Sequence, residues 1–108
     1  MISYDDFAKL EIKIGRILSV DVVPDADKLL RLMVDLGEET PRQIISGIRT
    51  YFEDPQSLVG TQCPFLTNLE PRVIRGLESN GMILAGSHEA LLALLVPSSE
   101  VPVGTKIR

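Results

Sequence analysis

The side chains best suited to bind a ligand lie in one stretch, residues 68–82. Among its polar or flexible members are Asn68, Arg72, Arg75, Ser79 and Met82. Arginine can make forked hydrogen bonds to phosphate or guanine, and Asn and Ser can read base edges or a 2′-hydroxyl. The apolar residues follow no sustained period, and Pro and Gly interrupt the backbone, so an irregular loop is expected. Such a loop could bind single-stranded nucleic acid or serve as a general protein-interaction surface.

The rest of the chain offers little for catalysis or for metal binding. His88 is the only histidine and Cys63 the only cysteine, so neither a Cys–His pair nor a zinc cluster is predicted. Asp25 and Asp27 lie in a turn without further predicted oxygen ligands. Neither glycine-rich phosphate-binding pattern is present. We therefore expect no enzyme activity, no metal site and no cofactor.

Length and composition favour one soluble domain, residues 1–108. A chain of this length can bury one core, and 44% hydrophobic with 24% charged residues is ordinary for a globular protein. No signal sequence or bilayer-spanning apolar run is present, so a cytoplasmic protein without membrane contact is expected. The net charge of −4 argues against indiscriminate binding to nucleic acid. From Thr61 to Arg75, however, one acid stands against two arginines.

Apolar alternation and turn residues predict a series of short strands after a capped helix at 4–9. Ser3 and Asp6 would cap that helix, and Phe7 and Leu10 would face inward. The first strand, 11–23, is expected to have a bulge or a bend at Gly15–Arg16. A short helix or turn is expected at 49–53, and Pro64 must face an edge, a bulge or a gap on the ligand side. The further strands are expected at 29–36, 42–48, 59–67, 82–85 and 101–107.

Five core strands with short connections favour an all-β barrel, in which a sheet curls to remove its edges. We expect the barrel over about 11–86, with a β-rich C-terminal extension over about 87–108. The apolar run Leu91–Val96 is either a buried strand or half of a dimer interface, and the pattern leaves both open.

Six blocks of sequence occur in a recognisable order. They are Lys13–Ile17, Ala26–Leu29, Val34–Gly37, Arg42–Ile48, the N-L-x-P…R-G-x-x-S-x-G-M spacing of Asn68–Met82, and Gly104–Ile107. With these blocks the chain resembles the tRNA-binding OB-fold domain found at the C-terminus of many methionyl-tRNA synthetases. The same domain occurs in stand-alone dimeric tRNA-binding proteins and in cytokine-like polypeptides of synthetase complexes. The resemblance covers nearly the whole chain and implies a five-stranded OB-fold barrel.

The resemblance implies a non-catalytic module that binds the outside of the tRNA L shape without strong preference for one tRNA. It implies a homodimer, either stand-alone or acting in trans with methionyl-tRNA synthetase. The RNA contacts that it implies are Lys28, Asn68, Arg75, Ser79 and Met82, with Arg42, Ser46 and Arg72 as neighbours. The dimer interface that it implies includes Leu91, Leu92, Leu94, Leu95 and Val96. Asn68 and Ser79 could instead brace their own loop.

Three positions depart from the family pattern. A histidine common before the proline of the Ala26–Leu29 turn is Val23 here, and Glu70 and Val73 stand where basic residues are usual. Losing positive charge should weaken phosphate contact. A peptide-binding export chaperone, from a related branch that lacks the Ala26–Leu29 turn and the Ser-x-Gly-Met end, is an alternative function. A purely structural dimerisation appendage is another.

Overall fold

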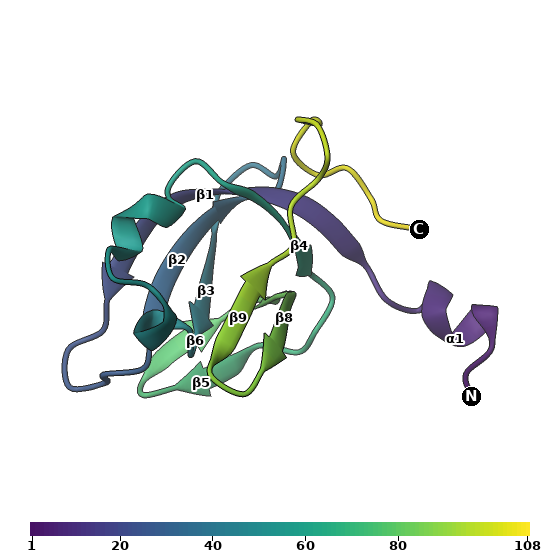
Figure 1. Cartoon of the computed structure of the whole chain (residues 1–108). Coiled ribbons are helices and arrows are strands. Elements are labelled where there is room, and N and C mark those ends of the chain that lie inside the picture. The colour runs from purple at the N-terminus through teal and green to yellow at the C-terminus, as the bar shows by residue number, and fades with distance from the viewer.

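A long first strand, β1 (Ile12–Val22), is the central strand of the barrel sheet (Figure 1). In the computed structural model, which describes all 108 residues, its first half pairs with β4 (Gln62–Leu66) and its second half with β2 (Leu30–Asp35). β3 (Arg42–Ser46) extends the sheet beyond β2, and β7 (Met82–Ile83) extends it beyond β4. The order β3-β2-β1-β4-β7 is antiparallel throughout, and the sheet curls into a nearly closed barrel. The predicted five-stranded barrel is confirmed.

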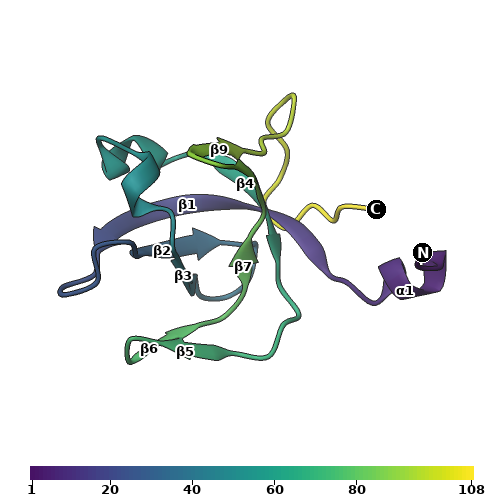
Figure 2. The same ribbon diagram turned by 60° about the horizontal axis from the view of Figure 1, so that its bottom comes forward.

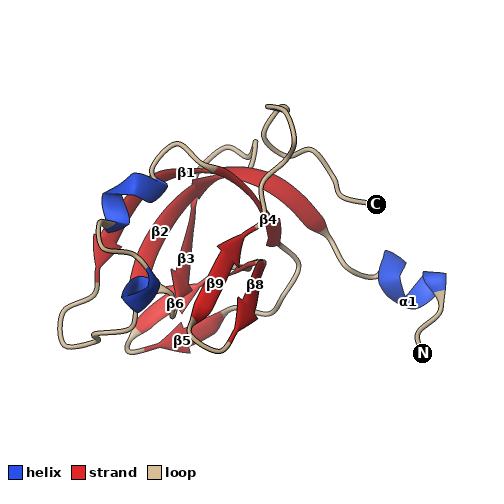
Figure 3. Ribbon diagram, viewed as in Figure 1, coloured by secondary structure: helices blue, strands red, loops and turns tan.

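The hydrophobic core fills the inside of this barrel. In β2 burial alternates as the period of 2 requires, with Leu30, Leu32 and Val34 inside, whereas all five residues of β4 are buried. The fully buried side chains of largest volume come from all four long strands and the segment after β2: Phe65, Ile17, Leu30, Leu32, Leu36, Ile44, Val34 and Cys63. Two 3-10 helices, η1 (Arg49–Tyr51) and η2 (Pro55–Leu58), connect β3 to β4 and supply the buried Leu58 (Figure 3).

The irregularity predicted in β1 at Gly15–Arg16 lies elsewhere. The register with β2 shifts between Ile17 and Ser19, which leaves Leu18 without a partner. β1 instead changes partner at Arg16, which is paired with both β2 and β4. The strand therefore passes from one neighbour to the other without an inserted residue at the glycine.

Pro64 lies inside β4, directly opposite Ile14. The N–H of Ile14 donates to the Thr105 carbonyl at 2.8 Å, and its carbonyl accepts from the Gly104 N–H at 2.7 Å. The missing N–H of the proline therefore removes no bond to β1. On the other side its carbonyl accepts from the Leu84 N–H at 3.1 Å. A position of this kind tolerates proline in a buried strand.

The stretch expected to be an irregular loop contains a β-hairpin. β5 (Arg72–Ile74) pairs with β6 (Leu77–Ser79) through the two-residue turn Arg75-Gly76. Both turn residues have positive φ, 53° and 78°, which is the backbone of a type I′ hairpin turn. We call residues 68–79 the arm. It extends from the barrel as a separate two-stranded ribbon (Figure 2).

The N-terminal helix, α1 (Tyr4–Ala8), has the predicted capping box. The Asp6 N–H donates to Ser3 Oγ, and the Ser3 N–H donates to Asp6 Oδ2, both at 3.2 Å. The expected inward orientation is wrong for Leu10, which is 40% exposed, and Phe7 is only partly buried. The physical reason is that α1 projects away from the barrel (Figure 1).

The C-terminal extension forms a second hairpin, β8 (Ala85–His88) with β9 (Leu91–Leu94). Leu92 and Leu94 pack against the barrel core. The strand predicted over 101–107 is reduced to a single bridge between Lys13 and Lys106, flanked by backbone bonds along β1. None of the helices has the length and apolar character needed to cross a lipid bilayer.

Replacing Gly15 by alanine is expected to destabilise the fold. A Cβ there would lie 2.7 Å from Val34 Cγ1 and 2.8 Å from Leu36 Cδ2, so two core side chains must move. Such overpacking costs about 2 kcal/mol of unfolding free energy. Urea denaturation measures the change. Gly47→Ala is the control, because its nearest atom would be 3.9 Å away, and an equal loss in both variants would contradict the packing argument.

Candidate nucleic-acid interface

The basic side chains of this chain divide into paired and unpaired groups. Five of the eleven have an acidic partner within 4.0 Å: Lys9, Lys13, Arg16, Arg31 and Arg42. The other six form no ion pair: Lys28, Arg49, Arg72, Arg75, Lys106 and Arg108. An unpaired cation can neutralise a phosphate without first breaking a salt bridge. The unpaired group is therefore the one to examine for a nucleic-acid interface.

The fold brings unpaired cations from three segments to one end of the barrel. Lys28, in the turn after β1, and Arg75, at the tip of the arm, line one groove of about 390 Å³. Leu29 and Ile74 form its apolar part. The Arg49 N–H, in η1, donates to the Lys28 carbonyl at 3.2 Å, so the backbones of these two residues are adjacent. Arg49 itself lines a second groove, together with Asp27 and Glu53. Sequence reasoning missed Arg49, because only the fold places it beside Lys28.

Acidic groups reduce the positive charge of this end. Asp25 and Asp27 line the same groove as Lys28 and Arg75. Glu70, where a basic residue is usual in the family, is exposed at the base of the arm. The interface therefore combines separated cations with nearby carboxylates rather than a continuous basic patch.

The two faces of the arm differ in chemistry. Cross-strand pairing sets Val73 opposite Glu78 and Ile74 opposite Leu77. Ile74 and Leu77 are partly buried, whereas Val73 is 74% exposed and Glu78 is also exposed. Val73, the second position where a basic residue is usual, thus shares the outer face with an acid. The positive charge of the arm comes from Arg72 and Arg75 alone.

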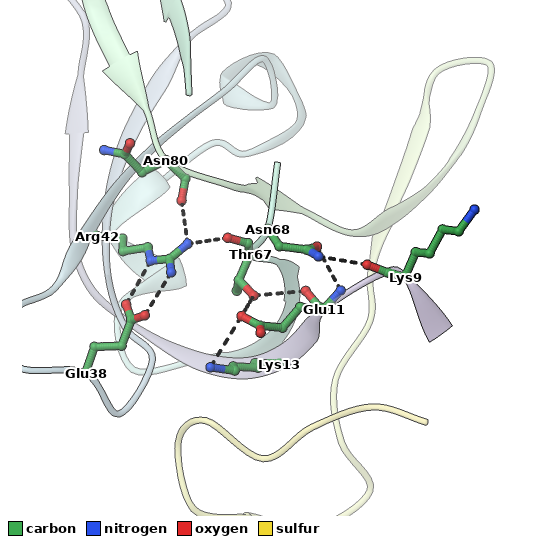
Figure 4. A network of polar contacts seen from close by, with 8 residues as sticks. All are labelled: Lys9, Glu11, Lys13, Glu38, Arg42, Thr67, Asn68 and Asn80. Atoms are coloured by element: carbon green, nitrogen blue, oxygen red, sulfur yellow. Dashed lines mark hydrogen bonds and ion pairs between the residues drawn. The ribbon is translucent and has the colours of Figure 1, made fainter. Parts of the chain in front are cut away.

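Asn68 braces the start of the arm. Its Oδ1 accepts a hydrogen bond from the Glu11 N–H, and its Nδ2 donates to the Lys9 carbonyl, both at 2.8 Å (Figure 4). Both ends of the amide are therefore satisfied by the segment between α1 and β1. Beside it, the Thr67 hydroxyl donates to Glu11 Oε1 at 2.7 Å, which lowers the pKa of that carboxyl. Asn68 could bind RNA or brace its own loop, and its two hydrogen bonds in this structure are those of a brace.

Ser79 holds β3 against the end of β6. The residue is buried, with only 4% of its surface exposed, and its Oγ accepts a hydrogen bond from the Ile45 N–H at 3.0 Å. The same hydroxyl donates to the Gly81 carbonyl at 3.0 Å. The hydroxyl is thus engaged in closing the barrel, and its role as an RNA contact stays a prediction.

Arg42 is the most extensively bonded side chain of this region (Figure 4). Its Nε and Nη2 donate to the two carboxylate oxygens of Glu38 at 2.8 Å each. Its Nη1 donates to the Thr67 carbonyl at 2.5 Å and to the Asn80 carbonyl at 3.3 Å. All three guanidinium nitrogens are therefore occupied within the chain.

The pair of Arg42 and Glu38 shifts both groups toward their charged forms. Hydrogen bonding to the Arg42 guanidinium lowers the pKa of Glu38, and the same bonds raise the pKa of Arg42. Because the folded-state pKa of Glu38 lies below its ordinary value, the pair contributes stability near neutral pH. That contribution is lost as the pH falls through the folded-state pKa of Glu38.

The remaining predicted contacts, Ser46 and Met82, lie on the neighbouring strands β3 and β7. Ser46 is at the end of β3, paired with Leu30, and its side chain makes no hydrogen bond within the chain. Met82 lies in β7 opposite Leu66 and is not among the residues that line the groove of Lys28. Val23, where the family commonly has histidine, is a buried core residue. No group of three or more His, Cys, Asp or Glu is placed to hold a metal ion.

Two solved structures share this architecture over the whole chain. A methionyl-tRNA synthetase (MetRS) related protein from Pyrococcus horikoshii matches with a TM-score of 0.92 and 31% identity, covering 100% of this chain and 98% of that one. The chaperone CsaA from Bacillus anthracis matches with a TM-score of 0.88 and 30% identity, covering 100% and 99%. The C-terminal domain of Plasmodium vivax p43 matches with a TM-score of 0.89 and 38% identity over 96% of this chain and 62% of that chain.

The sequence is similar to part of several methionine–tRNA ligases. Methionine–tRNA ligase from Methanosarcina mazei is 46% identical over 109 aligned positions, and that from Methanoregula boonei is 52% identical over 108. All of this chain is covered, but it spans only 15% and 16% of those two proteins. The family model described as "Putative tRNA binding domain" matches residues 12–106. The chain therefore belongs to the tRNA-binding domain family.

Proposed function

We propose that this chain is a non-catalytic module that binds tRNA through the barrel end formed by Lys28, Arg49 and the arm. The observation that carries the proposal is the coincidence of two findings. The family match spans residues 12–106, and within that span the unpaired cations Lys28, Arg49, Arg72 and Arg75 come from the turn after β1, η1 and the arm.

In this proposal the cations neutralise phosphates and the neighbouring apolar atoms support them. Lys28 and Arg75 contact phosphates from the two sides of their groove, and Leu29 and Ile74 offer apolar surface between them. Four such contacts give a salt dependence of roughly −3 in log K against log salt concentration. Asp25 and Asp27 keep the affinity modest and favour a ligand that follows the shape of the groove. Folded RNA presents phosphates in such fixed positions.

The proposed partner in the cell is methionyl-tRNA synthetase, in the cytoplasm. Support comes from the relatives, which are methionine–tRNA ligases whose length this chain spans only in small part. A second RNA-binding module held near a synthetase raises the local concentration of tRNA without touching the catalytic site. The same effect arises whether the module is covalently joined or bound in trans.

We further propose that the module works as a homodimer through part of the C-terminal extension. Leu91, Leu95 and Val96 are 71%, 47% and 60% exposed, whereas Leu92 and Leu94 pack against the chain's own core. Leu95 and Val96 also border an apolar groove of about 240 Å³ that Ile14, Pro64, Val101 and Ile107 help to line. A second copy that buries these side chains would remove a contiguous apolar surface from water.

A peptide-binding chaperone is the second candidate function. One observation favours it, namely the structural match to CsaA, described as a chaperone, over the entire chain. Its ligand would be an unfolded peptide bound through apolar contacts, which salt does not weaken as it weakens phosphate contacts. The two candidates therefore differ in ligand and in salt dependence.

Arg75→Gln is expected to weaken tRNA binding about fivefold at low salt and to reduce the salt-dependence slope by about one, since one phosphate contact is lost. Binding isotherms with unfractionated tRNA at several salt concentrations measure both quantities. Arg108→Gln is the matched control, because Arg108 is also unpaired but lies at the C-terminus, far from the arm (Figure 1). The tRNA proposal fails if the wild-type protein does not bind at low salt. Displacement of tRNA by a labelled unfolded peptide, insensitive to salt, would favour the chaperone.

Val96→Lys is expected to dissociate the homodimer. Burying an unpaired ammonium group at the interface should raise the dimer dissociation constant about 30-fold or more. Sedimentation velocity over a range of protein concentrations measures the change. Val73→Lys is the control, since Val73 is at least as exposed but lies on the arm. A monomeric wild-type protein, or equal dissociation in both variants, contradicts the proposed interface.

A further inference from the structure

One guanidinium bridges the two ends of the arm. Arg42 Nη1 donates to the carbonyl of Thr67 at 2.5 Å and to the carbonyl of Asn80 at 3.3 Å. Thr67 immediately precedes the arm and Asn80 immediately follows it. The arm therefore leaves and rejoins the barrel at two points held by the same side chain (Figure 4).

Other contacts hold only one end each. Asn68 ties the outgoing end to the segment before β1, as described above. Gln43 holds the returning end. Its side-chain Nε2 donates to the Glu78 carbonyl at 2.9 Å, and its backbone carbonyl accepts from the Asn80 N–H at 2.8 Å. Arg42 is the side chain that contacts both ends, so it fixes the spacing and direction with which the arm emerges.

The same bonds make Arg42 a poor phosphate ligand. Its remaining nitrogens, Nε and Nη2, are held by the carboxylate of Glu38 in a bidentate pair. An approaching phosphate would have to compete with that carboxylate and displace two backbone carbonyls. Breaking such charge-assisted bonds costs much of what a new phosphate contact would return. This differs from the contact that the family resemblance implies for Arg42.

We infer that Arg42 is a positioning residue, which orders the arm so that Arg75 faces the RNA bound by Lys28. The inference rests on the proposed tRNA function. Arg42 acts by raising the fraction of molecules in which the arm has its binding orientation. If that fraction falls to between about 10% and 20%, the apparent dissociation constant rises about five- to tenfold. The number of neutralised phosphates stays the same, so the salt-dependence slope does not change.

Arg42→Lys tests this inference, because lysine keeps the positive charge but cannot make the forked set of bonds. We expect tRNA binding five- to tenfold weaker than wild type with an unchanged salt slope. We also expect faster amide hydrogen exchange in the hairpin of the arm, residues 72–79, with unchanged exchange in β1 and β2. Arg31→Lys is the matched control, since Arg31 pairs with Asp21 on the barrel at 3.1 Å and makes no hydrogen bond to the arm. That variant should match wild type in affinity, slope and arm exchange.

Opposite results overturn the inference. A salt slope reduced by about one would make Arg42 a phosphate contact, and wild-type affinity with wild-type arm exchange would remove its positioning role. If Arg42→Lys does not fold, Glu38→Gln replaces it, since it frees the guanidinium while keeping Arg42. Faster arm exchange without a gain in affinity supports positioning. Tighter binding with unchanged exchange overturns it.

The outcomes separate this inference from the proposed function. If the wild-type protein does not bind tRNA, the proposed function fails on its own. Arm exchange in Arg42→Lys then decides alone whether Arg42 orders the arm, and unchanged exchange overturns that claim as well.

Discussion

The barrel has to close between β3 and the chain around β6 and β7, where no continuous backbone ladder joins the two edges. Side chains supply most of the connection. Ser79 accepts from the Ile45 N–H, Arg42 reaches the Asn80 carbonyl, and one backbone bond joins Asn80 to Gln43. These bonds satisfy polar groups that an open sheet edge would expose. The arm begins and ends at this seam, so barrel closure and arm placement depend on the same few groups.

A chain of net charge −4 has no long-range field that would draw a polyanion toward it. The proposed interface with RNA must therefore work at short range. The pairing of charges allows this, because arginines such as Arg16 and Arg31 are occupied by acids while Lys28, Arg49 and Arg75 are not. What distinguishes the proposed binding end is freedom from partners more than density of charge. Such an interface selects by the position of phosphates rather than by bulk attraction.

The strands and the helix cap could be predicted because each depends on neighbours in sequence. Alternation placed β1 to β4, and Ser3 with Asp6 forms the local capping box. The hairpin of the arm was missed, since its type I′ turn is Arg-Gly rather than the usual Asn-Gly or Asp-Gly. Lys28 and Arg75 come together from segments far apart in the chain. The same is true of Arg42 and the two carbonyls that it binds, those of Thr67 and Asn80. No local pattern encodes which of several arginines will find an internal partner.

The side chains on the outer face of the arm do not hold the arm in place. Val73 and Glu78 lie opposite each other on exposed strand positions, while the arm is held at its two ends, by its own Asn68 and Ser79 and by Arg42 of the barrel. Charge can therefore change at these two positions without altering the core or the seam. The charge of the proposed interface and the placement of the arm are therefore set by different residues, so that one can change while the other stays the same.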